Sequence, residues 1–206
     1  MEQLLKERQI DWLLHFTQAE NLPNIFRYGL LPRSVINNRG IQSNFNDEYR
    51  YDDCANAVCM SIEFPNYKMF YQLRKKNPEV DWVVLLLDAK ILCNFDCAYC
   101  YANAGSAEMF NTPIEQRMGK EAFLHLFDDC PNGNTREKLN IGSWLPTNPQ
   151  AEVLVFASIP VTYILKVFFE DWQTLNKYSN IIPDFIKAEV KQKAFSYRKD
   201  YSFWQA

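Results

Sequence analysis

A carboxylate opens one of the most apolar stretches of this chain. Glu152 stands at the start of the run from Ala151 to Phe156, whose Val, Leu and Phe residues are typical of a buried strand. Side chains alternate between the two faces of a strand, so Gln150 and Glu152 point the same way. Burying an ionised carboxylate costs several kcal/mol unless it has partners. Glu152 is therefore expected either to mark where the strand leaves solvent or to be held by hydrogen bonds at a cleft.

The composition indicates one folded domain over residues 1–206, because 48% of the residues are hydrophobic and 15% are aromatic. A net charge of −3 excludes a broad basic surface, so nucleic acid is expected to bind only in a local groove. No apolar run reaches the roughly 18 residues of a membrane span, and the N-terminus mixes charges into its apolar residues, unlike a signal peptide. We therefore expect a cytoplasmic protein without a membrane partner, whose six cysteines are thiols or metal ligands.

Hydrophobic patterns predict a mixture of strands and helices. Strands are predicted over residues 11–17, 55–64, 80–88, 149–156 and 161–168, and helices over residues 1–10, 19–28, 67–76 and 113–128, with a helical tail at the C-terminal end. Two long loops, 31–53 and 130–148, separate these elements, and loops of such length in a compact domain are usually functional.

Several residues have both a structural and a functional interpretation. His15 and Thr17 share one face at a strand end before a helix, which suits an anion or a ribose. A His at a strand end is more often a hydrogen-bonded structural residue. Arg50 lies among acidic residues and forms either a salt-bridge network or a guanidinium fork for a pyrophosphate or carboxylate. The aromatic residues between Tyr67 and Tyr71 form either core or a stacking wall for a planar ring.

Cys93, Cys97 and Cys100 have the C-x3-C-x2-C spacing of radical S-adenosylmethionine enzymes, in which three thiolates bind an iron–sulfur cluster. Too few residues follow for the partial barrel of those enzymes, and repeated strand–helix units are missing. A structural zinc site is a further alternative. The interpretation we adopt is that these cysteines are small apolar fillers in a connecting segment.

Taken in order, several motifs resemble those of the DarT-type nucleic-acid ADP-ribosyltransferases. The resemblance covers most of residues 12–165 and does not include the cysteine cluster. Its motifs are HFT at 15–17, NLPNI at 21–25, GL at 29–30, Arg50, SIEFPNYKMFY at 61–71, NA at 103–104, AEVLV at 151–155 and IP at 159–160.

The resemblance implies an α+β fold, namely an ADP-ribosyltransferase-like split, mostly antiparallel sheet with surrounding helices and an NAD+ cleft between the sheet halves. It implies that NAD+ is the ADP-ribose donor, that no metal takes part, and that the acceptor is a base of single-stranded DNA or RNA. A cognate antitoxin that removes the mark or blocks the enzyme, in a toxin–antitoxin or phage-defence system, is the implied partner. The implied residues are Glu152 and Arg50 for catalysis, His15, Thr17, Gly29, Leu30, Tyr67 and Phe70 for NAD+, and Gln150, Trp144 and Lys68 for the acceptor.

The chemistry requires the same residue types. Breaking the bond between nicotinamide and ribose passes through an oxocarbenium-like state, which a nearby carboxylate stabilises. Alternatives remain a radical iron–sulfur enzyme using Cys93, Cys97 and Cys100, a non-catalytic nucleic-acid-binding module, ADP-ribosyl transfer to protein, and phosphate transfer to RNA. The sequence does not decide between DNA and RNA, and it does not identify the modified base.

Overall fold

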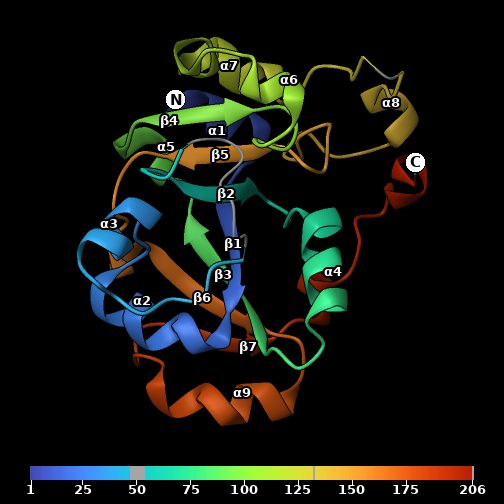
Figure 1. The fold of residues 1–206 in the computed structure, drawn as a ribbon. Helices are drawn as coiled ribbons and strands as arrows, with labels where there is room; N and C mark the ends of the chain where they lie inside the picture. The colour runs from blue at the N-terminus through green and yellow to red at the C-terminus, as the bar shows by residue number, and fades with distance from the viewer. Residues whose placement is uncertain (47–53, 132, 206) are drawn as a thin grey trace.

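A seven-stranded sheet forms the centre of the computed structural model, which describes residues 1–46, 54–131 and 133–205. Its strands follow the order β4-β5-β2-β1-β3-β6-β7 (Figure 1). Every neighbouring pair is antiparallel except β6 and β7, which run parallel. The strands are β1 (Trp12–Gln18), β2 (Val58–Ile62), β3 (Trp82–Asp88), β4 (Cys97–Cys100), β5 (Glu152–Val155), β6 (Ile164–Phe169) and β7 (Lys187–Val190).

Helices surround this sheet. Figure 1 shows α2 and α4 on opposite sides of β1 and β3, with α7 near β4 and α9 beyond β7. The helices are α1 (Glu2–Arg8), α2 (Leu22–Tyr28), α3 (Arg33–Asn38), α4 (Tyr67–Lys76), α5 (Ile91–Asn94), α6 (Ala107–Phe110), α7 (Gly119–His125), α8 (Arg136–Leu139) and α9 (Trp172–Tyr178).

The sheet splits between β1 and β2. These strands pair only through Leu13 with Ile62 and Leu14 with Ser61, whereas β1 pairs with β3 along its whole length, from Trp12 to Gln18. Among the residues that the structure describes, the second half of β1 therefore has no strand partner on its β2 side, and the two halves of the sheet diverge there. This divergence creates the space for the site described below.

Glu63 fixes the start of β1 beside the end of β2. Its Oε1 accepts hydrogen bonds from the backbone N–H groups of Asp11, at 2.7 Å, and Trp12, at 2.9 Å. Glu63 itself adopts a left-handed backbone conformation, with φ of 58°. Burial raises the pKa of this carboxyl, and the two backbone hydrogen bonds partly offset that effect. Glu63 therefore has a structural role at the narrow end of the split.

The core has two layers because β3 is buried on both faces. Val83, Leu85 and Leu87 lie in one apolar cluster with Leu22 of α2 and Phe123 of α7. Trp82, Val84 and Leu86 lie in a second cluster, which contains Phe70 of α4 and Phe195 near the C-terminus. The unbroken apolar sequence of β3 follows from this burial on both faces.

Several predicted regions differ from the structure. The predicted loops 31–53 and 130–148 contain the short helices α3 and α8, and the helix predicted over 113–128 is reduced to α7, preceded by a 3-10 turn. The segment containing Cys97 and Cys100 is not a connection but strand β4, which pairs with β5 and is fully buried. The predicted helical tail is wrong in part, because residues 187–190 form β7 beside β6. The charged residues of this segment suggested a solvated helix, but edge strands also carry charges, and Lys166 of β6 pairs with Glu189 of β7 at 3.0 Å.

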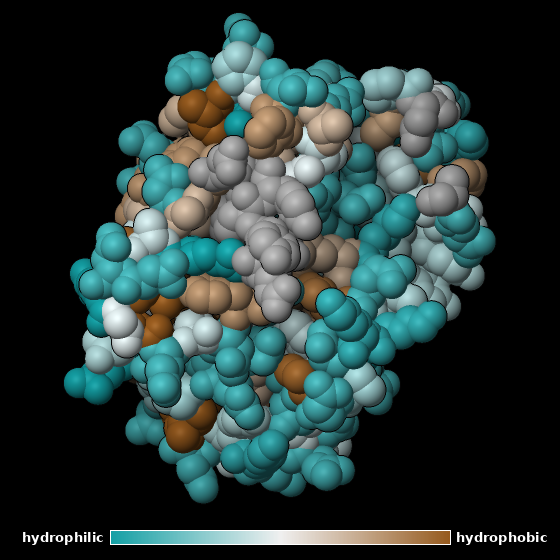
Figure 2. All heavy atoms as spheres, in the orientation of Figure 1, coloured by the Kyte–Doolittle hydropathy of each residue, from teal (hydrophilic) through white to brown (hydrophobic). Residues whose placement is uncertain are grey.

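The described residues include no helix long and apolar enough to cross a membrane. Hydrophilic residues cover most of the face seen in Figure 2, and the hydrophobic patches on it are scattered.

Gly29 allows the chain after α2 to lie against Ile159. The backbones of Leu30 and Ile159 exchange two hydrogen bonds, of 2.9 and 2.8 Å, and a Cβ at Gly29 would lie 2.1 Å from the carbonyl oxygen of Ile159. Gly29 also has a positive φ of 81°. We expect Gly29→Ala to lower the free energy of unfolding by more than about 2 kcal/mol, because positive φ costs an L-residue about 1–2 kcal/mol before any clash. Urea denaturation measures this loss.

Gly40→Ala is the matched control, because Gly40 also has a positive φ, 62°, but nothing lies within 4 Å of its Cβ position. We expect it to show the cost of the backbone conformation without the clash. Equal losses in the two variants would contradict the close contact with Ile159.

Candidate active site

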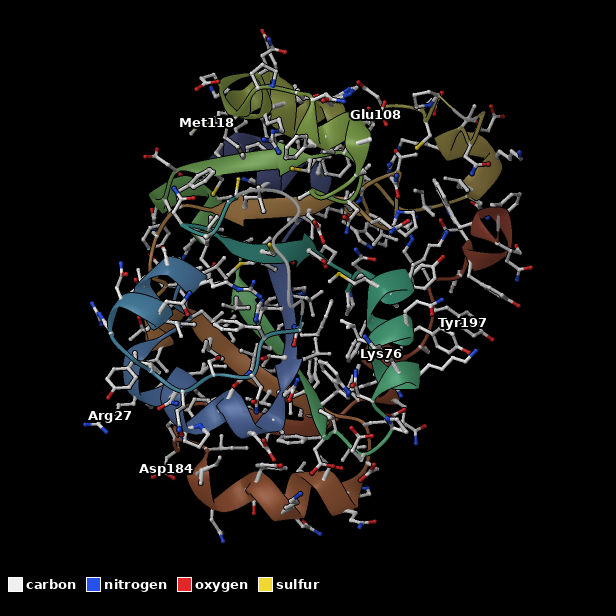
Figure 3. The ribbon with its side chains drawn as sticks, viewed as in Figure 1. Arg27, Lys76, Glu108, Met118, Asp184 and Tyr197 are labelled. Carbon is white, nitrogen blue, oxygen red and sulfur yellow. The ribbon has the colours of Figure 1, made fainter. Side chains whose placement is uncertain are left out.

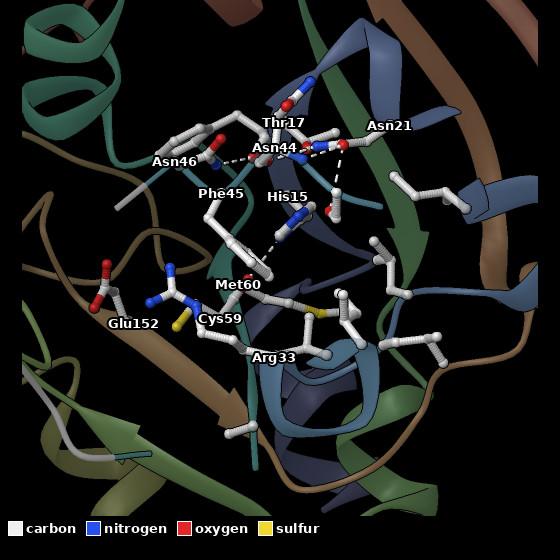
Figure 4. A pocket seen from close by; sticks show the side chains of 18 of the residues that line it. His15, Thr17, Asn21, Arg33, Asn44, Phe45, Asn46, Cys59, Met60 and Glu152 are labelled. Atoms are coloured by element: carbon white, nitrogen blue, oxygen red, sulfur yellow. Dashed lines mark hydrogen bonds between the residues drawn. The ribbon is translucent and has the colours of Figure 1, made fainter. Parts of the chain in front are cut away.

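A cavity of about 230 Å³ opens where the sheet splits (Figure 4). The second half of β1 and most of β2 form its floor, α2 and α3 form one wall, and residues 41–46 pass over it. Asn103, Ala104, Gly105 and Glu152 close the opposite side. The site therefore combines residues from both halves of the sheet.

Glu152 is buried at this cavity and surrounded by hydrogen-bond donors. It begins β5 and is only 8% exposed. Its Oε2 accepts a hydrogen bond from the backbone N–H of Ala104 at 2.8 Å, and its Oε1 accepts from Asn66 Nδ2 at 3.3 Å and Asn103 Nδ2 at 3.4 Å. Donors of this kind stabilise a negative charge. The structure therefore holds a carboxylate in a fixed orientation inside an enclosed site.

His15 bridges the two halves of the split sheet. Its Nδ1 lies 2.8 Å from the carbonyl oxygen of Cys59 on β2. A carbonyl oxygen only accepts, so Nδ1 carries the proton and donates it. This bond fixes the orientation of the imidazole ring at the cavity floor, where β1 and β2 no longer pair.

Asparagine side chains hold the segment 43–46 over the end of β1. Asn21 Nδ2 donates to Thr17 Oγ1 at 2.9 Å and to the carbonyl oxygen of Asn44 at 2.8 Å, and Asn21 Oδ1 accepts from the backbone N–H of Asn44 at 2.8 Å. Asn46 Nδ2 donates to the carbonyl oxygen of Phe16 at 2.8 Å. These bonds build a polar rim around Thr17.

Arg33 brings a guanidinium group to the same cavity. The group lies 4.2 Å from the ring centroid of Phe45, within cation–π range. In Figure 4 it points into the cavity on the side where Glu152 lies. The cavity therefore presents a cationic group, an aromatic ring and a buried carboxylate.

The structure brings together five of the residues predicted to form the site. His15, Thr17, Gly29, Leu30 and Glu152 all line the cavity. The predicted role of Arg50 concerns a residue outside the described part of the chain.

The other predicted site residues do not line the cavity. They are Tyr67, Phe70, Lys68, Gln150 and Trp144. Phe70 is 1% exposed and stacks on Phe16 with 4.5 Å between ring centroids, so it supports the cavity floor from the core. Burial raises the pKa of Tyr67 to about 12, and its hydroxyl has no hydrogen-bond partner among the residues that the structure describes.

The three predicted acceptor residues have other surroundings in the structure. Lys68 Nζ donates to the carbonyl oxygen of Trp204 at 2.7 Å, and Gln150 is half-buried two residues before Glu152. Trp144 is 40% exposed, and its ring packs over Gly142. Their roles remain predictions.

Three cavity residues were missed as site residues. Asn21, Arg33 and Phe45 line it together with the predicted residues. Asn21 belongs to the NLPNI motif, which indicates the family resemblance but not a contact with the cavity. Arg33 begins α3 and Phe45 follows that helix, within the segment 31–53 that the sequence predicted as one loop, so the pattern did not indicate them.

The cysteine arrangement is incompatible with a three-thiolate cluster. Cys97 and Cys100 face opposite sides of β4, since Cys97 packs in the core cluster with Phe123 and Cys100 packs in the cluster with Met109. Burial raises the pKa of Cys97 to about 12 and that of Cys100 to about 11, so both remain neutral thiols near neutral pH. Within the described residues, no group of three or more His, Cys, Asp and Glu side chains is placed to hold a metal ion.

Solved structures share this fold at low sequence identity. Thermosipho africanus DarTG in complex with ADP-ribose is 16% identical, with a TM-score of 0.61 over 89% of this chain and 50% of that one, so the present chain spans half its length. Thermus sp. 2.9 DarT in complex with carba-NAD+ is 14% identical, with a TM-score of 0.62 over 90% of this chain and 97% of that one. The same Thermus protein in complex with ADP-ribosylated ssDNA is 13% identical, with a TM-score of 0.53 over 91% of this chain and 97% of that one.

This fold is shared with solved DarT structures, and a carboxylate-bearing cavity lies where the sheet splits. A sequence model described as "ssDNA thymidine ADP-ribosyltransferase, DarT" matches residues 14–201. The chain therefore belongs to the DarT family. No curated protein sequence matches it.

The predictions of this family, of the split-sheet fold, of an ADP-ribosyltransferase and of NAD+ as donor are confirmed. The family description favours an ADP-ribosyltransferase over the alternative of a radical iron–sulfur enzyme.

Proposed function

We propose that this protein transfers one ADP-ribose group from NAD+ to a thymine base in single-stranded DNA. The main support for the proposal is that the Glu152 carboxylate is held at the cavity by hydrogen bonds from Ala104, Asn66 and Asn103. Single-stranded DNA is the favoured acceptor over RNA because the family is described by thymidine in ssDNA. A thymine inside a duplex has its ring N–H occupied by base pairing, so the base must be unstacked and unpaired to react.

The proposed reaction exchanges one glycosidic bond for another. The bond between ribose C1′ and the nicotinamide nitrogen breaks, and its electron pair leaves with neutral nicotinamide. Thymine N3, the only ring N–H of a thymine nucleotide, forms the new bond to C1′, and its proton passes to the Glu152 carboxylate. Before that transfer, the same negative charge stabilises the oxocarbenium-like ribose.

The remaining cavity residues suit the donor nucleotide. His15 and Thr17, fixed by Cys59 O and Asn21, would contact the ribose and phosphate. Arg33 at the cavity, and Arg50 by the family resemblance, would bind the pyrophosphate, because guanidinium groups hold phosphate oxygens through paired hydrogen bonds. Only the nicotinamide end would then remain free to leave.

The proposed biological setting is a toxin acting in the cytoplasm, controlled by a cognate antitoxin. Modified bases in single-stranded DNA would block templated copying, so a cell that makes such an enzyme needs a means to remove the mark or to restrain the enzyme. The family resemblance supports this setting, and a relative of this fold is named DarTG.

Intact-mass analysis tests the reaction. Purified protein is incubated with NAD+ and matched single-stranded oligonucleotides that contain either one thymidine, one N3-methylthymidine or no thymidine, with the RNA counterpart in parallel. We expect a gain of one ADP-ribose on the thymidine oligonucleotide only. A gain on the N3-methyl or thymidine-free DNA would contradict the assigned atom or base, and no gain on any nucleic acid would refute the proposed function.

A further inference from the structure

Hydrogen bonds and ring packing join helix α4 to the C-terminal segment 191–204. Arg74 Nη1 of α4 donates to the carbonyl oxygen of Phe195 at 2.6 Å, and Lys68 Nζ donates to that of Trp204 at 2.7 Å. The rings of Phe70 and Phe195 pack beneath, with centroids 5.6 Å apart. Side chains on the outer side of the two segments are therefore held in fixed relation to each other. Figure 3 shows Lys76 and Tyr197 at this edge of the molecule, beside α4.

The charge of this surface is opposite to that of the chain. All charged residues of 67–76 and 191–204 are basic except the buried Asp200, although the protein carries a net charge of −3. Arg74 pairs with Glu170, and Arg198 pairs with Asp200. The other basic residues are Lys68, Lys75, Lys76, Lys191, Lys193 and Lys199.

Aromatic rings lie exposed among these lysines. Tyr71 on α4 is 57% exposed, Tyr197 is 58% exposed and Phe203 is 41% exposed. Tyr197 also lies against Tyr201, with ring centroids 4.0 Å apart. Exposed rings interspersed with lysines are characteristic of surfaces on which the bases of a single strand stack while its phosphates meet positive charge. Protein interfaces, in contrast, are depleted of lysine.

This surface begins at the catalytic carboxylate. Asn66, whose side chain caps α4 by accepting from the Met69 N–H at 3.2 Å, also donates to Glu152. Met69 lines the cavity. The ten residues of α4 then extend about 15 Å away from the site at 1.5 Å per residue. A strand with one base in the cavity therefore has an adjacent path along α4.

We propose that the surface formed by 67–76 and 191–204 binds the single-stranded DNA that flanks the modified base. This proposal rests on the proposed function. Tyr71 and Tyr197 stack on flanking bases, and Lys75, Lys76 and Lys199 contact phosphates. The cavity then selects the base to be modified, while this surface supplies most of the affinity for a longer strand.

The experiment compares oligonucleotides of about 4 and about 16 nucleotides, each with one thymidine, since single-strand sites commonly span this range. Affinity is measured by fluorescence anisotropy and transfer by kcat/KM. We expect Tyr71→Ala/Tyr197→Ala to weaken binding of the long strand at least about tenfold, with kcat/KM on the short one within about twofold of wild type. For Lys75→Gln/Lys76→Gln, the slope of log affinity against log salt should fall by about 1.4, because each phosphate contact contributes about 0.7.

Matched controls carry the same changes elsewhere. Trp172 is 68% exposed and Phe185 is 64% exposed, but acidic residues adjoin both in sequence. Trp172→Ala/Phe185→Ala and Lys90→Gln/Lys120→Gln should bind both strands as wild type does. The proposal would be overturned if the Tyr71→Ala/Tyr197→Ala variant bound the long strand with wild-type affinity. It would also be overturned if the control variants lost as much DNA affinity, or if the variant kept its DNA affinity and instead lost binding of a protein partner. If the wild-type protein transferred ADP-ribose to neither the short nor the long oligonucleotide, that result would count against the proposed function. Fluorescence anisotropy would still measure DNA binding by the surface in that case.

Discussion

Glu152→Gln is expected to reduce the rate of ADP-ribosyl transfer by at least about 10²–10³-fold, the usual effect of removing one electrostatic group that acts on the transition state. The substitution retains the shape of the side chain but removes its negative charge, and it places an amide N–H among the donors of Ala104, Asn66 and Asn103. Single-turnover measurements with intact-mass detection report the rate. Calorimetry with NAD+ reports whether the donor still binds, which we expect within a few-fold of wild type.

Glu63→Gln provides the matched control. Glu63 is also a carboxylate that accepts backbone hydrogen bonds, but it holds the start of β1 and does not line the cavity. We expect this variant to lose about 1–3 kcal/mol of stability with its transfer rate at saturating substrate unchanged. A Glu152→Gln enzyme as active as wild type would remove the basis of the proposed mechanism.

Arg198→Leu is expected to lower the free energy of unfolding by about 3–5 kcal/mol, because it leaves the Asp200 carboxylate buried without its cationic partner. Arg198 is 4% exposed and Asp200 is 2% exposed. Arg198 Nε lies 2.7 Å from Asp200 Oδ1, and the guanidinium also donates to the carbonyl oxygens of Pro146, at 2.8 Å, and Thr147, at 2.9 Å. Urea denaturation measures the loss. The double variant Arg198→Leu/Asp200→Leu should recover much of it, and a double variant as unstable as the single one would contradict this account.

The same pair gives the fold a defined response to acid. Burial alone would raise the pKa of Asp200, but hydrogen bonds from Arg198 and Trp204 outweigh burial and hold it below the ordinary value of 3.8. A pKa that is lower in the folded state stabilises the fold above the unfolded-state value, and this stabilisation is lost as the pH falls through the folded-state value. We therefore expect the free energy of unfolding of the wild type to decrease as the pH is lowered below about 4. The Arg198→Leu variant should lack this part of the decrease.

The local signals in the sequence identified much of the site. The alternating and helical patterns predicted β1, α2 and α4 to within three residues at each end, and α4 was predicted with its observed bounds, 67–76. Glu152 was expected at the mouth of a buried strand, and it begins β5. Such predictions succeed because the order of apolar and polar residues along one strand or helix indicates which of its faces is buried.

Errors arose where pairing between distant segments determined the structure. The segment of Cys97 and Cys100 became β4 because β5 offers it a partner, and residues 187–190 became β7 because β6 has an open edge. Neither partner is visible in the local pattern. Tertiary context overrides weak local preference in such short strands.

The sequence by itself determined the chemical inventory of this protein: a carboxylate before an apolar strand, His and Thr on one strand face, and the order of motifs that resembles one family. Only the tertiary structure decided which groups meet. Glu152 receives its hydrogen bonds from residues 86, 49 and 48 positions away, and His15 reaches Cys59 across the split. It also placed Cys97 and Cys100 on opposite faces and added Arg33 and Phe45 to the cavity. The physical reason is that a burial pattern is local, whereas the partner that satisfies a buried polar group is chosen by the packing of the whole chain.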